Sequence, residues 1–145
     1  MGQLSAWSIM LCLAPTLVHA QAPGWLADPK SGCRVWAGRI GAGAGFTWTG
    51  SCVEGFASGQ GTLTWANGNR YEGEMKSGKY EGKGVFTFAN GIQYEGELRD
   101  GRPNGAGTLT RPDGQFFRGT WNNGCYRQGS RWSAVMVTAE ECGFR

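Results

Sequence analysis

The chain has 145 residues, room for one domain, and a formal net charge of +3 from 14 basic and 11 acidic residues. Because both signs are interspersed along the sequence, the composition argues against a nucleic-acid-binding stripe or a polybasic membrane patch. Glycine accounts for 26 residues, far above the average usage of about 7%, but seven Trp, seven Phe and four Tyr argue against disorder and predict tight turns around packed rings.

The first 20 residues are predicted to be a secretory signal peptide. Residues 6–18 form an uncharged, mainly apolar run, and Val18-His19-Ala20 places small residues where a signal peptidase cleaves. The alternative is a membrane anchor, although the run has only about 13 residues and contains Pro15, whereas a spanning helix needs about 20. We therefore expect cleavage after Ala20 and a secreted or periplasmic mature protein, even though no Lys or Arg precedes the apolar run.

The predicted mature chain contains no histidine, because His19, the only one in the sequence, lies in the signal peptide that is removed. Ser-His-Asp and Cys-His catalysis and imidazole metal sites are therefore excluded for it. Cys12 lies in the signal peptide, and the even number of cysteines that remains favours disulfides in an exported protein. These four are Cys33, Cys52, Cys125 and Cys142, and we expect no cofactor.

Residues 48–124 repeat with a period of 23 residues. The segment Tyr71-Glu72-Gly73-Glu74-Met75 recurs as Tyr94-Glu95-Gly96-Glu97-Leu98, and weaker copies start at Trp48 and Phe117. A glycine-rich second half also recurs, at Gly59–Trp65, Gly82–Phe88 and Gly105–Arg111. The predicted units are 48–70, 71–93 and 94–116, followed by a half unit at 117–124.

Both halves of each unit alternate with the period of 2 that is typical of β-strands. Tyr71, Gly73 and Met75 share one face, and Glu72 and Glu74 share the other. The missing side chain at Gly73 allows a neighbouring ring to lie flat over the backbone. Turn dipeptides that accept the positive φ of a type I′ turn close the units: Asn67-Gly68, Asn90-Gly91 and Asp113-Gly114. The sequence therefore predicts antiparallel hairpins joined in a meander.

These units resemble MORN repeats, whose 23-residue motif runs tyrosine, any residue, glycine, any residue and a bulky aromatic residue, then a glycine-rich loop and a closing Asp/Asn-Gly. Residues 71–93 and 94–116 match this motif in full, 48–70 is a close variant, and 117–124 matches the first half only. The resemblance implies an all-β fold, an elongated single-layer antiparallel β-meander. For function it implies an interaction module, a membrane-associated scaffold or an appendage of an enzyme.

The segments that flank the repeats, 21–47 and 125–145, are predicted to cap the exposed ends of the sheet, with a final strand that includes Trp132 and residues 135–137. In a meander, six strand spacings of about 4.8 Å would separate Cys52 from Cys125 by about 29 Å, whereas a disulfide needs Cα atoms within about 7 Å. The predicted pairs are therefore Cys33–Cys52 and Cys125–Cys142. A Cys₄ zinc site is the weaker alternative, because the spacings lack a C-x₂-C pair.

Two groups of side chains are candidates for a site. The aromatic column is a candidate interaction surface, although its rings alternatively pack on one another as the core; it comprises Trp48, Trp65, Tyr71, Phe88, Tyr94 and Phe117. Glu72 and Glu95 are expected on one face, roughly 9–10 Å apart, close to the 6.5–9.5 Å of an inverting glycosidase. Their slots are those that keep a repeat sheet soluble, so catalysis is the weaker interpretation. The glycine pairs at 59/61, 82/84 and 105/107 are interpreted as turn residues, because a phosphate-binding loop would precede a helix.

The sequence thus favours a non-enzymatic, exported binding or scaffolding protein that presents its sheet to a partner protein or a cell-envelope polymer. The alternative is binding to anionic lipid headgroups at a membrane surface, through basic residues near the loops. These are Lys76, Lys79, Lys83, Arg99 and Arg102. No nucleic-acid partner is expected, and the sheet edges leave oligomerisation open.

Overall fold

The computed structural model describes residues 24–41 and 44–145, so the predicted signal peptide lies outside the described residues. Within them the chain is all-β, with twelve strands in one sheet. The strands are β1 (Trp25–Ala27), β2 (Arg34–Trp36), β3 (Phe46–Trp48), β4 (Ser51–Val53), β5 (Phe56–Trp65), β6 (Arg70–Lys76), β7 (Lys79–Thr87), β8 (Gln93–Arg99), β9 (Arg102–Thr110), β10 (Phe116–Asn122), β11 (Cys125–Gln128) and β12 (Arg131–Ala134).

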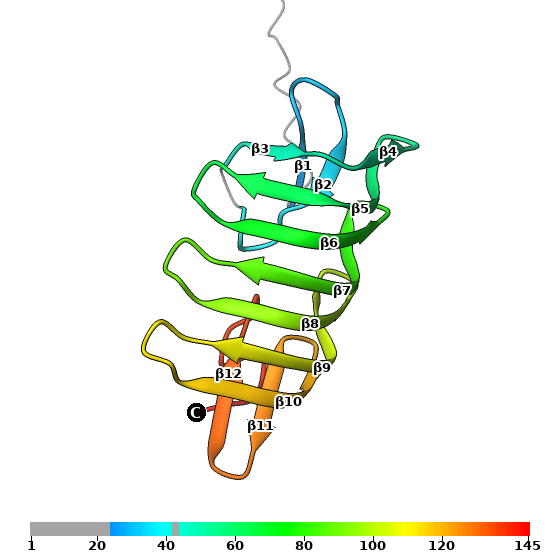
Figure 1. The fold of residues 1–145 in the computed structure, drawn as a ribbon. Helices are drawn as coiled ribbons and strands as arrows, with labels where there is room; N and C mark the ends of the chain where they lie inside the picture. The colour runs from blue at the N-terminus through cyan, green and yellow to red at the C-terminus, as the bar shows by residue number, and fades with distance from the viewer. Residues whose placement is uncertain (1–23, 42–43) are drawn as a thin grey trace, which may run out of the picture.

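The repeats form the long central part of the sheet. Strands β5 to β10 are antiparallel neighbours in chain order, and Figure 1 shows them stacked as successive rungs. Burial alternates along them as the sequence pattern requires: in β6, the buried Tyr71, Gly73 and Met75 alternate with more exposed neighbours. The predicted antiparallel meander of hairpin repeats is confirmed.

A row of paired glycines crosses the middle of the repeat strands. Each glycine faces another on the neighbouring strand, in the order Gly61, Gly73, Gly84, Gly96, Gly107 and Gly119. Aromatic rings lie against this row, because a Cβ atom built on Gly73 would stand 2.5 Å from the hydroxyl oxygen of Tyr71. The prediction that glycine makes room for a ring here is therefore confirmed.

Three further glycines lie inside strands and not in the turns that the sequence predicts. Gly59, Gly82 and Gly105 have φ values of 76°, 60° and 100° within β5, β7 and β9. Close to the last two, the pairing register shifts between β6 and β7 and between β8 and β9. A bulge commonly contains a residue with left-handed backbone, which glycine adopts without steric cost. The interpretation of these glycines as turn residues is therefore wrong.

The predicted Asn-Gly and Asp-Gly hairpins form, but their turns are not of type I′. Only the glycine has positive φ there, and at Asn67-Gly68 the Gly68 N–H donates to the Trp65 carbonyl (3.0 Å). This is a type I turn followed by a left-handed glycine. The turns with two consecutive positive φ values lie at the other ends of the strands, at Glu54-Gly55, Ser77-Gly78, Asp100-Gly101 and Asn123-Gly124.

The terminal segments fold back over one face of the sheet. Val35 is buried in the same core as the aromatic residues of the repeats, and Ile40 and Met136 pack against that core. A 3.7 Å ion pair between Arg39 and Glu141 joins the N-terminal segment to the C-terminal one. We call the face that these segments cover the inner face and the opposite one the outer face.

Two details of the caps differ from a simple meander with a strand at residues 135–137. Strand β2 meets β5 in a single parallel pair, Arg34 with Phe56. The final strand, β12, includes Trp132 as predicted but ends at Ala134, so the prediction that it extends over 135–137 is wrong. Met136 has a φ of 64°, which interrupts the extended backbone and turns this segment onto the core.

Both predicted disulfides are confirmed. The Cα atoms are 5.8 Å apart in Cys33–Cys52 and 5.6 Å apart in Cys125–Cys142, and the sequence separations are 19 and 17 residues. The first links the N-terminal segment to β4, and the second links β11 to the C-terminal segment. Loops of this length stabilise a fold by about 3 kcal/mol each in the loop-entropy description.

Candidate functional site: a groove on the outer face

The aromatic residues predicted as an interaction surface belong largely to the core. Tyr71 and Tyr94 are 0% exposed, Trp65 1% and Phe117 4%, whereas Trp48 and Phe88 are half-buried. Their rings contact one another and further core rings; the centroids of Tyr71 and Tyr80, for example, are 4.6 Å apart. This burial fits the alternative in which the rings supply the core, and it directs the search for a site to the outer face.

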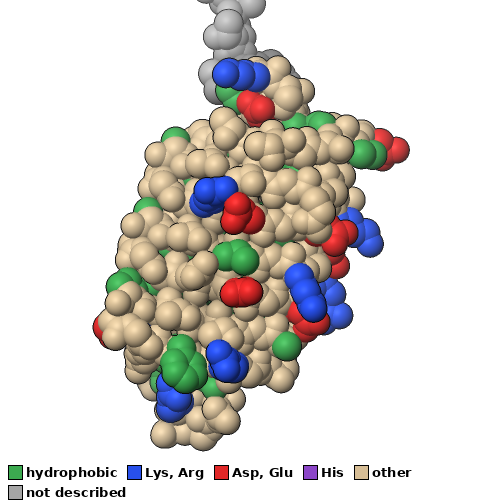
Figure 2. Space-filling view, in the orientation of Figure 1, with side chains coloured by type: hydrophobic (Ala, Val, Ile, Leu, Met, Phe, Trp, Pro, Cys, Tyr) green, Lys and Arg blue, Asp and Glu red, His purple; other side chains and the backbone are tan. Residues whose placement is uncertain are grey.

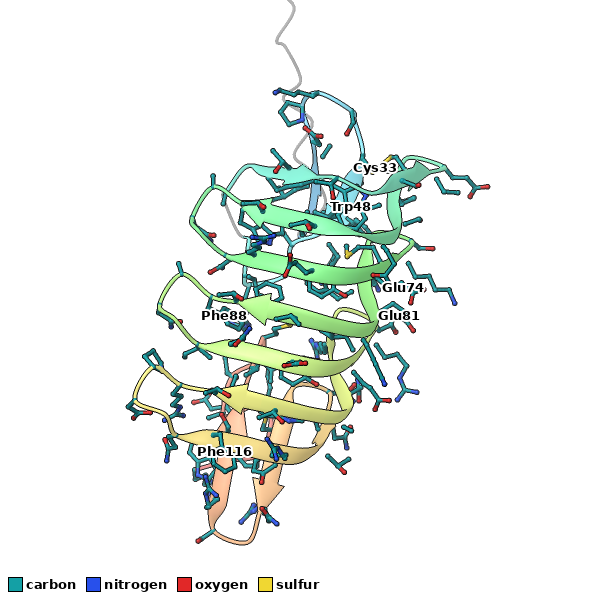
Figure 3. The ribbon with its side chains drawn as sticks, in the orientation of Figure 1. Cys33, Trp48, Glu74, Glu81, Phe88 and Phe116 are labelled. Carbon is teal, nitrogen blue, oxygen red and sulfur yellow. A yellow bond between two sulfur atoms is a disulfide. The ribbon has the colours of Figure 1, made fainter. Side chains whose placement is uncertain are left out.

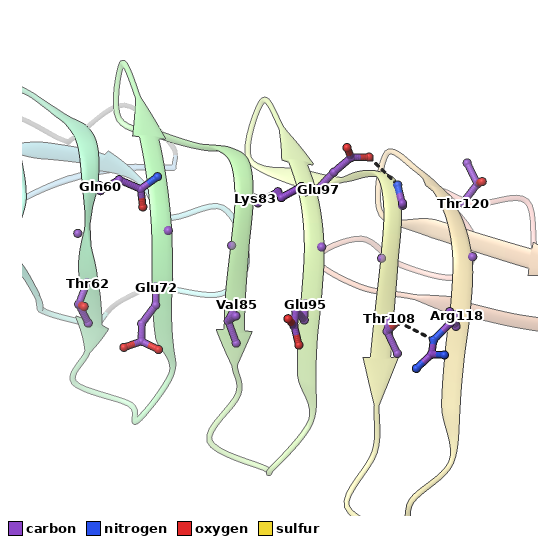
Figure 4. A pocket seen from close by; sticks show the side chains of 17 residues that line it. Gln60, Thr62, Glu72, Lys83, Val85, Glu95, Glu97, Thr108, Arg118 and Thr120 are labelled. Carbon is purple, nitrogen blue, oxygen red and sulfur yellow. Dashed lines mark hydrogen bonds between the residues drawn. The ribbon is translucent and has the colours of Figure 1, made fainter.

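A shallow groove of about 1180 Å³ crosses the outer face from β5 to β10. Its floor is main chain along the glycine row, because side chains at these positions would point to the inner face and only their neighbours project outward. Figure 4 shows side chains on both sides of this floor, projecting from successive strands. The groove is therefore long, open to solvent and perpendicular to the strands, a shape that suits an extended ligand more than a compact one.

Side chains that lie opposite one another on adjacent strands form one rim of the groove. The pairing register places them in a continuous line: Thr62, Glu72, Val85, Glu95, Thr108 and Arg118. We call this line the first rim. The other rim includes Gln60, Lys83, Glu97 and Thr120, and Figure 4 shows both. Hydroxyl, amide and charged groups thus flank a floor of exposed backbone, and all of them can form hydrogen bonds with a polar ligand.

Two carboxylates of the groove already have partners within the sheet. Glu72 forms an exposed 2.6 Å ion pair with Arg70. Glu97 accepts a 2.7 Å hydrogen bond from the Ala106 N–H, beside the bulge at Gly105. Glu97 therefore stabilises an irregular backbone segment, a role that the sequence alone did not indicate.

Glu72 and Glu95, the pair considered for glycoside hydrolysis, do lie on the same face. Both belong to the first rim, and Val85 stands between them on β7. They face an open groove that does not enclose a substrate, and Glu72 is already paired with Arg70. In the described residues, no group of three or more His, Cys, Asp or Glu side chains is placed to hold a metal ion.

The basic residues considered for lipid binding lie apart from the groove, with the exception of Lys83. Lys76 and Lys79 flank the Ser77-Gly78 turn, and Arg99 and Arg102 flank the equivalent Asp100-Gly101 turn. Lys79 forms a 3.8 Å ion pair with Asp100, which connects the two turns. These four residues thus gather on the side of the sheet where the strands end in these turns, which we call the basic edge. In the part of the chain that the structure describes, no helix is long and apolar enough to cross a membrane.

Several groove residues were missed in the sequence, among them Gln60, Val85 and Thr108. A signal for them was present: the glycines of the two halves of each unit, such as Gly73 and Gly84, pair in any hairpin of this register. Because the positions of the glycine row point to the inner face, the residues directly before and after each of them project from the outer face and form the two rims.

Comparison with known protein families identifies the repeat. The family model described as MORN repeat matches residues 48–70, 71–93 and 94–116. No curated protein matches the chain significantly. MORN repeats are a non-catalytic repeat that generally mediates interactions with proteins or membrane lipids. The chain thus contains three consecutive MORN repeats, over residues 48–116.

Proposed function

We propose that this protein is a non-enzymatic, exported binding or scaffolding protein that holds an extended partner in the groove of its outer face. The partner is a protein segment or a cell-envelope polymer. The observation that supports the proposal is the groove itself, with its backbone floor and two polar rims across β5–β10. The inner face offers less to a partner, because the terminal segments and the core rings occupy it.

Substitution in the middle of the first rim tests this proposal. Val85→Trp would fill the groove, whereas Thr87→Trp adds the same side chain two residues along β7, outside the groove lining. We expect cell-wall polymer purified from the source organism to co-sediment with the wild type and Thr87→Trp, and at least about tenfold less with Val85→Trp. For a protein partner, a photo-cross-linker at position 85 is expected to capture it in the exporting cell and one at position 87 is not. Equal behaviour of the two positions in both assays would refute the groove as the binding surface.

Lipid binding is the alternative function, supported by the basic edge formed by Lys76, Lys79, Arg99 and Arg102. It predicts binding to phosphatidylglycerol vesicles that collapses as salt rises from about 0.05 to 0.5 M, because exposed charges are then screened. Indifference to these vesicles, together with groove-dependent polymer or protein binding, supports the first function instead.

Export is the second part of the proposal. Two disulfides support it, because such bonds persist mainly in oxidising compartments. The intact mass of the protein from its native host is expected to lack residues 1–20 and to rise by about 4 Da on reduction, the mass of four hydrogen atoms. A full-length chain with thiols that alkylate without reduction would contradict export.

A further inference from the structure

Three guanidinium groups surround two adjacent phenylalanines at one end of the sheet. The Arg118 Cζ lies 5.7 Å from the centre of the Phe116 ring, and the Arg111 and Arg131 Cζ atoms lie 5.0 and 5.2 Å from that of Phe117. Phe117 is buried, but Phe116 is 50% exposed. Figure 3 labels Phe116 on β10, and Figure 2 shows an exposed hydrophobic side chain with basic side chains beside it in this region. Phe116 and Phe117 are consecutive on β10 and project from opposite faces, so Arg111, which lies over the buried Phe117, belongs to the inner face. Arg131 lies over Phe117 too, but it reaches the Phe116 carbonyl at the edge of β10. We call Arg118, Arg131 and Phe116 the arginine cluster.

The three arginines are held in place by neutral acceptors. They donate to Gln115 Oε1 (3.0 Å), Thr108 Oγ1 (3.4 Å) and the Phe116 carbonyl (2.7 Å), respectively. The ion pairs formed among the described residues are elsewhere: Arg39–Glu141, Arg70–Glu72 and Lys79–Asp100. Asp113, the acidic residue in the adjoining turn, accepts from the Gln115 N–H. The cluster therefore presents oriented positive charge that no carboxylate in the described chain neutralises.

The choice of residue is also informative. From residue 99 onward the chain has seven arginines, no lysine and four acidic residues, so this part of the sequence accounts for the whole net charge of +3. Arginine presents a planar fork of donors that matches a carboxylate in a bidentate geometry, whereas lysine is a point charge. The fork matches a phosphate as well, so arginine beside an exposed ring indicates recognition of an anionic group by paired hydrogen bonds.

The cluster is continuous with the groove. Arg118 is the last residue of the first rim, so a ligand that lies along the groove reaches Arg118 and Phe116 at the β10 end. The rims approaching it carry the hydroxyl and amide groups of Gln60, Thr62, Thr108 and Thr120, which suit a chain of sugars. They also carry three carboxylates, of which Glu72 is paired with Arg70 and Glu97 accepts from the Ala106 N–H, so the acidic group of a ligand is bound at the β10 end.

A bilayer is a poorer match for this region. The large hydrophobic residues that are exposed in the described part of the chain are Val53, Phe116 and Trp132, on three different strands, β4, β10 and β12. A peripheral membrane protein inserts a contiguous apolar area, which these separate side chains do not form.

We propose that the arginine cluster is the subsite at which the groove binds an acidic polysaccharide. Arg118 and Arg131 pair with uronate carboxylates, and the exposed ring of Phe116 stacks on a sugar ring. The inference rests on the proposed function and specifies its partner as a carboxylate-bearing glycan.

Binding to alginate, with dextran as the neutral counterpart, tests the inference. We expect the wild type to bind alginate and not dextran, and Arg118→Gln to bind alginate about tenfold more weakly, with a larger loss in the Arg118→Gln/Arg131→Gln double variant. Phe116→Ala is expected to weaken alginate binding severalfold without removing charge. Lys76→Gln/Arg99→Gln removes the same net charge as the double variant, but at the basic edge, and is expected to bind alginate within about twofold of the wild type. Unfolding midpoints of all variants confirm that each is folded.

Other outcomes overturn the inference in distinguishable ways. If Lys76→Gln/Arg99→Gln loses as much alginate affinity as Arg118→Gln/Arg131→Gln, net charge alone attracts alginate to the protein. Binding of polyglutamate or of phosphatidylglycerol vesicles, but not of alginate, would assign the cluster to an acidic protein or a membrane. If Val85→Trp abolishes binding of cell-wall polymer while the arginine variants bind it normally, the proposed function stands and the glycan subsite is wrong.

Discussion

Tyrosine hydroxyls in this sheet have two different environments. Tyr71 and Tyr94, at equivalent repeat positions, donate to the carbonyls of Glu74 (2.7 Å) and Glu97 (2.8 Å). Trp48 occupies the same position of the first repeat, and its indole N–H donates to the equivalent Ser51 carbonyl (2.9 Å). In the three full repeats this position therefore combines a ring that covers the glycine row with a donor at its far end, whereas Phe117 of the half unit supplies a ring without a donor. Tyr80 differs, because its buried hydroxyl lies beside the buried indole N–H of Trp65 and has no acceptor for its own proton among the described residues.

Removing these hydroxyls one at a time should have opposite consequences. Tyr71→Phe is expected to lower the free energy of unfolding by about 1 kcal/mol, because the Glu74 carbonyl loses its donor. Tyr80→Phe should cause no loss, and a gain of up to about 1 kcal/mol, because it removes a buried polar atom that lacks an acceptor. Urea denaturation followed by tryptophan fluorescence measures both values. A Tyr80→Phe variant as destabilised as Tyr71→Phe would contradict the assignment.

The glycine row can be tested with a single methyl group. In Gly73→Ala the new Cβ atom would stand 2.5 Å from the Tyr71 hydroxyl oxygen and 2.8 Å from the Gly84 Cα atom, so we expect a loss of about 3 kcal/mol. Gly45→Ala is the matched control, because no described atom lies within 4 Å of its Cβ position and its φ is not positive. Denaturant titration should leave Gly45→Ala within about 0.5 kcal/mol of the wild type. Equal stability of the two variants would show that the row is not tightly packed.

At the scale of the hairpin, each repeat uses two kinds of turn. The two-residue turns place a non-glycine residue in the left-handed region, with φ values of 49° at Ser77 and 52° at Glu54. Asparagine tolerates this conformation better than serine or glutamate, because its short polar side chain hydrogen-bonds locally.

Substituting asparagine at these turns is therefore expected to be stabilising. Ser77→Asn and Glu54→Asn should each raise the free energy of unfolding by about 0.5 kcal/mol, measured by thermal and urea denaturation. Asn123, which already occupies the equivalent position with a φ of 48°, shows that the chain accepts this residue. A decrease in stability in both variants would argue against the left-handed backbone at these positions.

The repeat made the hairpins predictable from the sequence, but it did not predict which type of turn closes each of them. The columns that contain Tyr71, Gly73 and Met75 specify strand faces and register, since a slip of one residue would expose the rings. Both kinds of turn contain glycine, so composition alone does not distinguish them. What separates them is the extra residue between the strands at Asn67-Gly68, which the sequence pattern does not delimit.

At the scale of the whole molecule, the terminal segments determine which face is free. They lie outside the repeat, so no periodicity indicated that Val35 and Met136 would pack against the inner face. The valines at 135 and 137 favoured a strand, but tertiary packing prevailed over that preference. The candidate site was missed for the same reason: with the inner face covered, the open surface is the outer groove, whose rims looked like ordinary solvent-facing positions.

Burial of three tyrosines is predicted to make the whole fold less stable at alkaline pH. Burial raises the pKa of Tyr71, Tyr80 and Tyr94 well above the ordinary value of about 10, and the nearby glutamates Glu74 and Glu97 add to this at Tyr71 and Tyr94. Because the folded pKa values are the higher ones, the native state keeps these protons at a pH where the unfolded chain has lost them. The three groups therefore leave stability unchanged below about pH 9, and stability falls as pH rises above about 10.

The expected decline is steep, about 1.4 kcal/mol per tyrosine for each pH unit, or about 4 kcal/mol for the three together. Against a domain stability of about 5–15 kcal/mol, cooperative unfolding should follow within a few pH units above 10. Urea midpoints measured at pH 8, 9, 10.5 and 11.5, soon after mixing so that the disulfides stay intact, give the slope. Tyr80→Phe should reduce this slope by about a third, since one of the three groups no longer titrates. A free energy of unfolding that is the same at pH 9 and pH 11.5 would mean that these hydroxyls are accessible to solvent in the native protein.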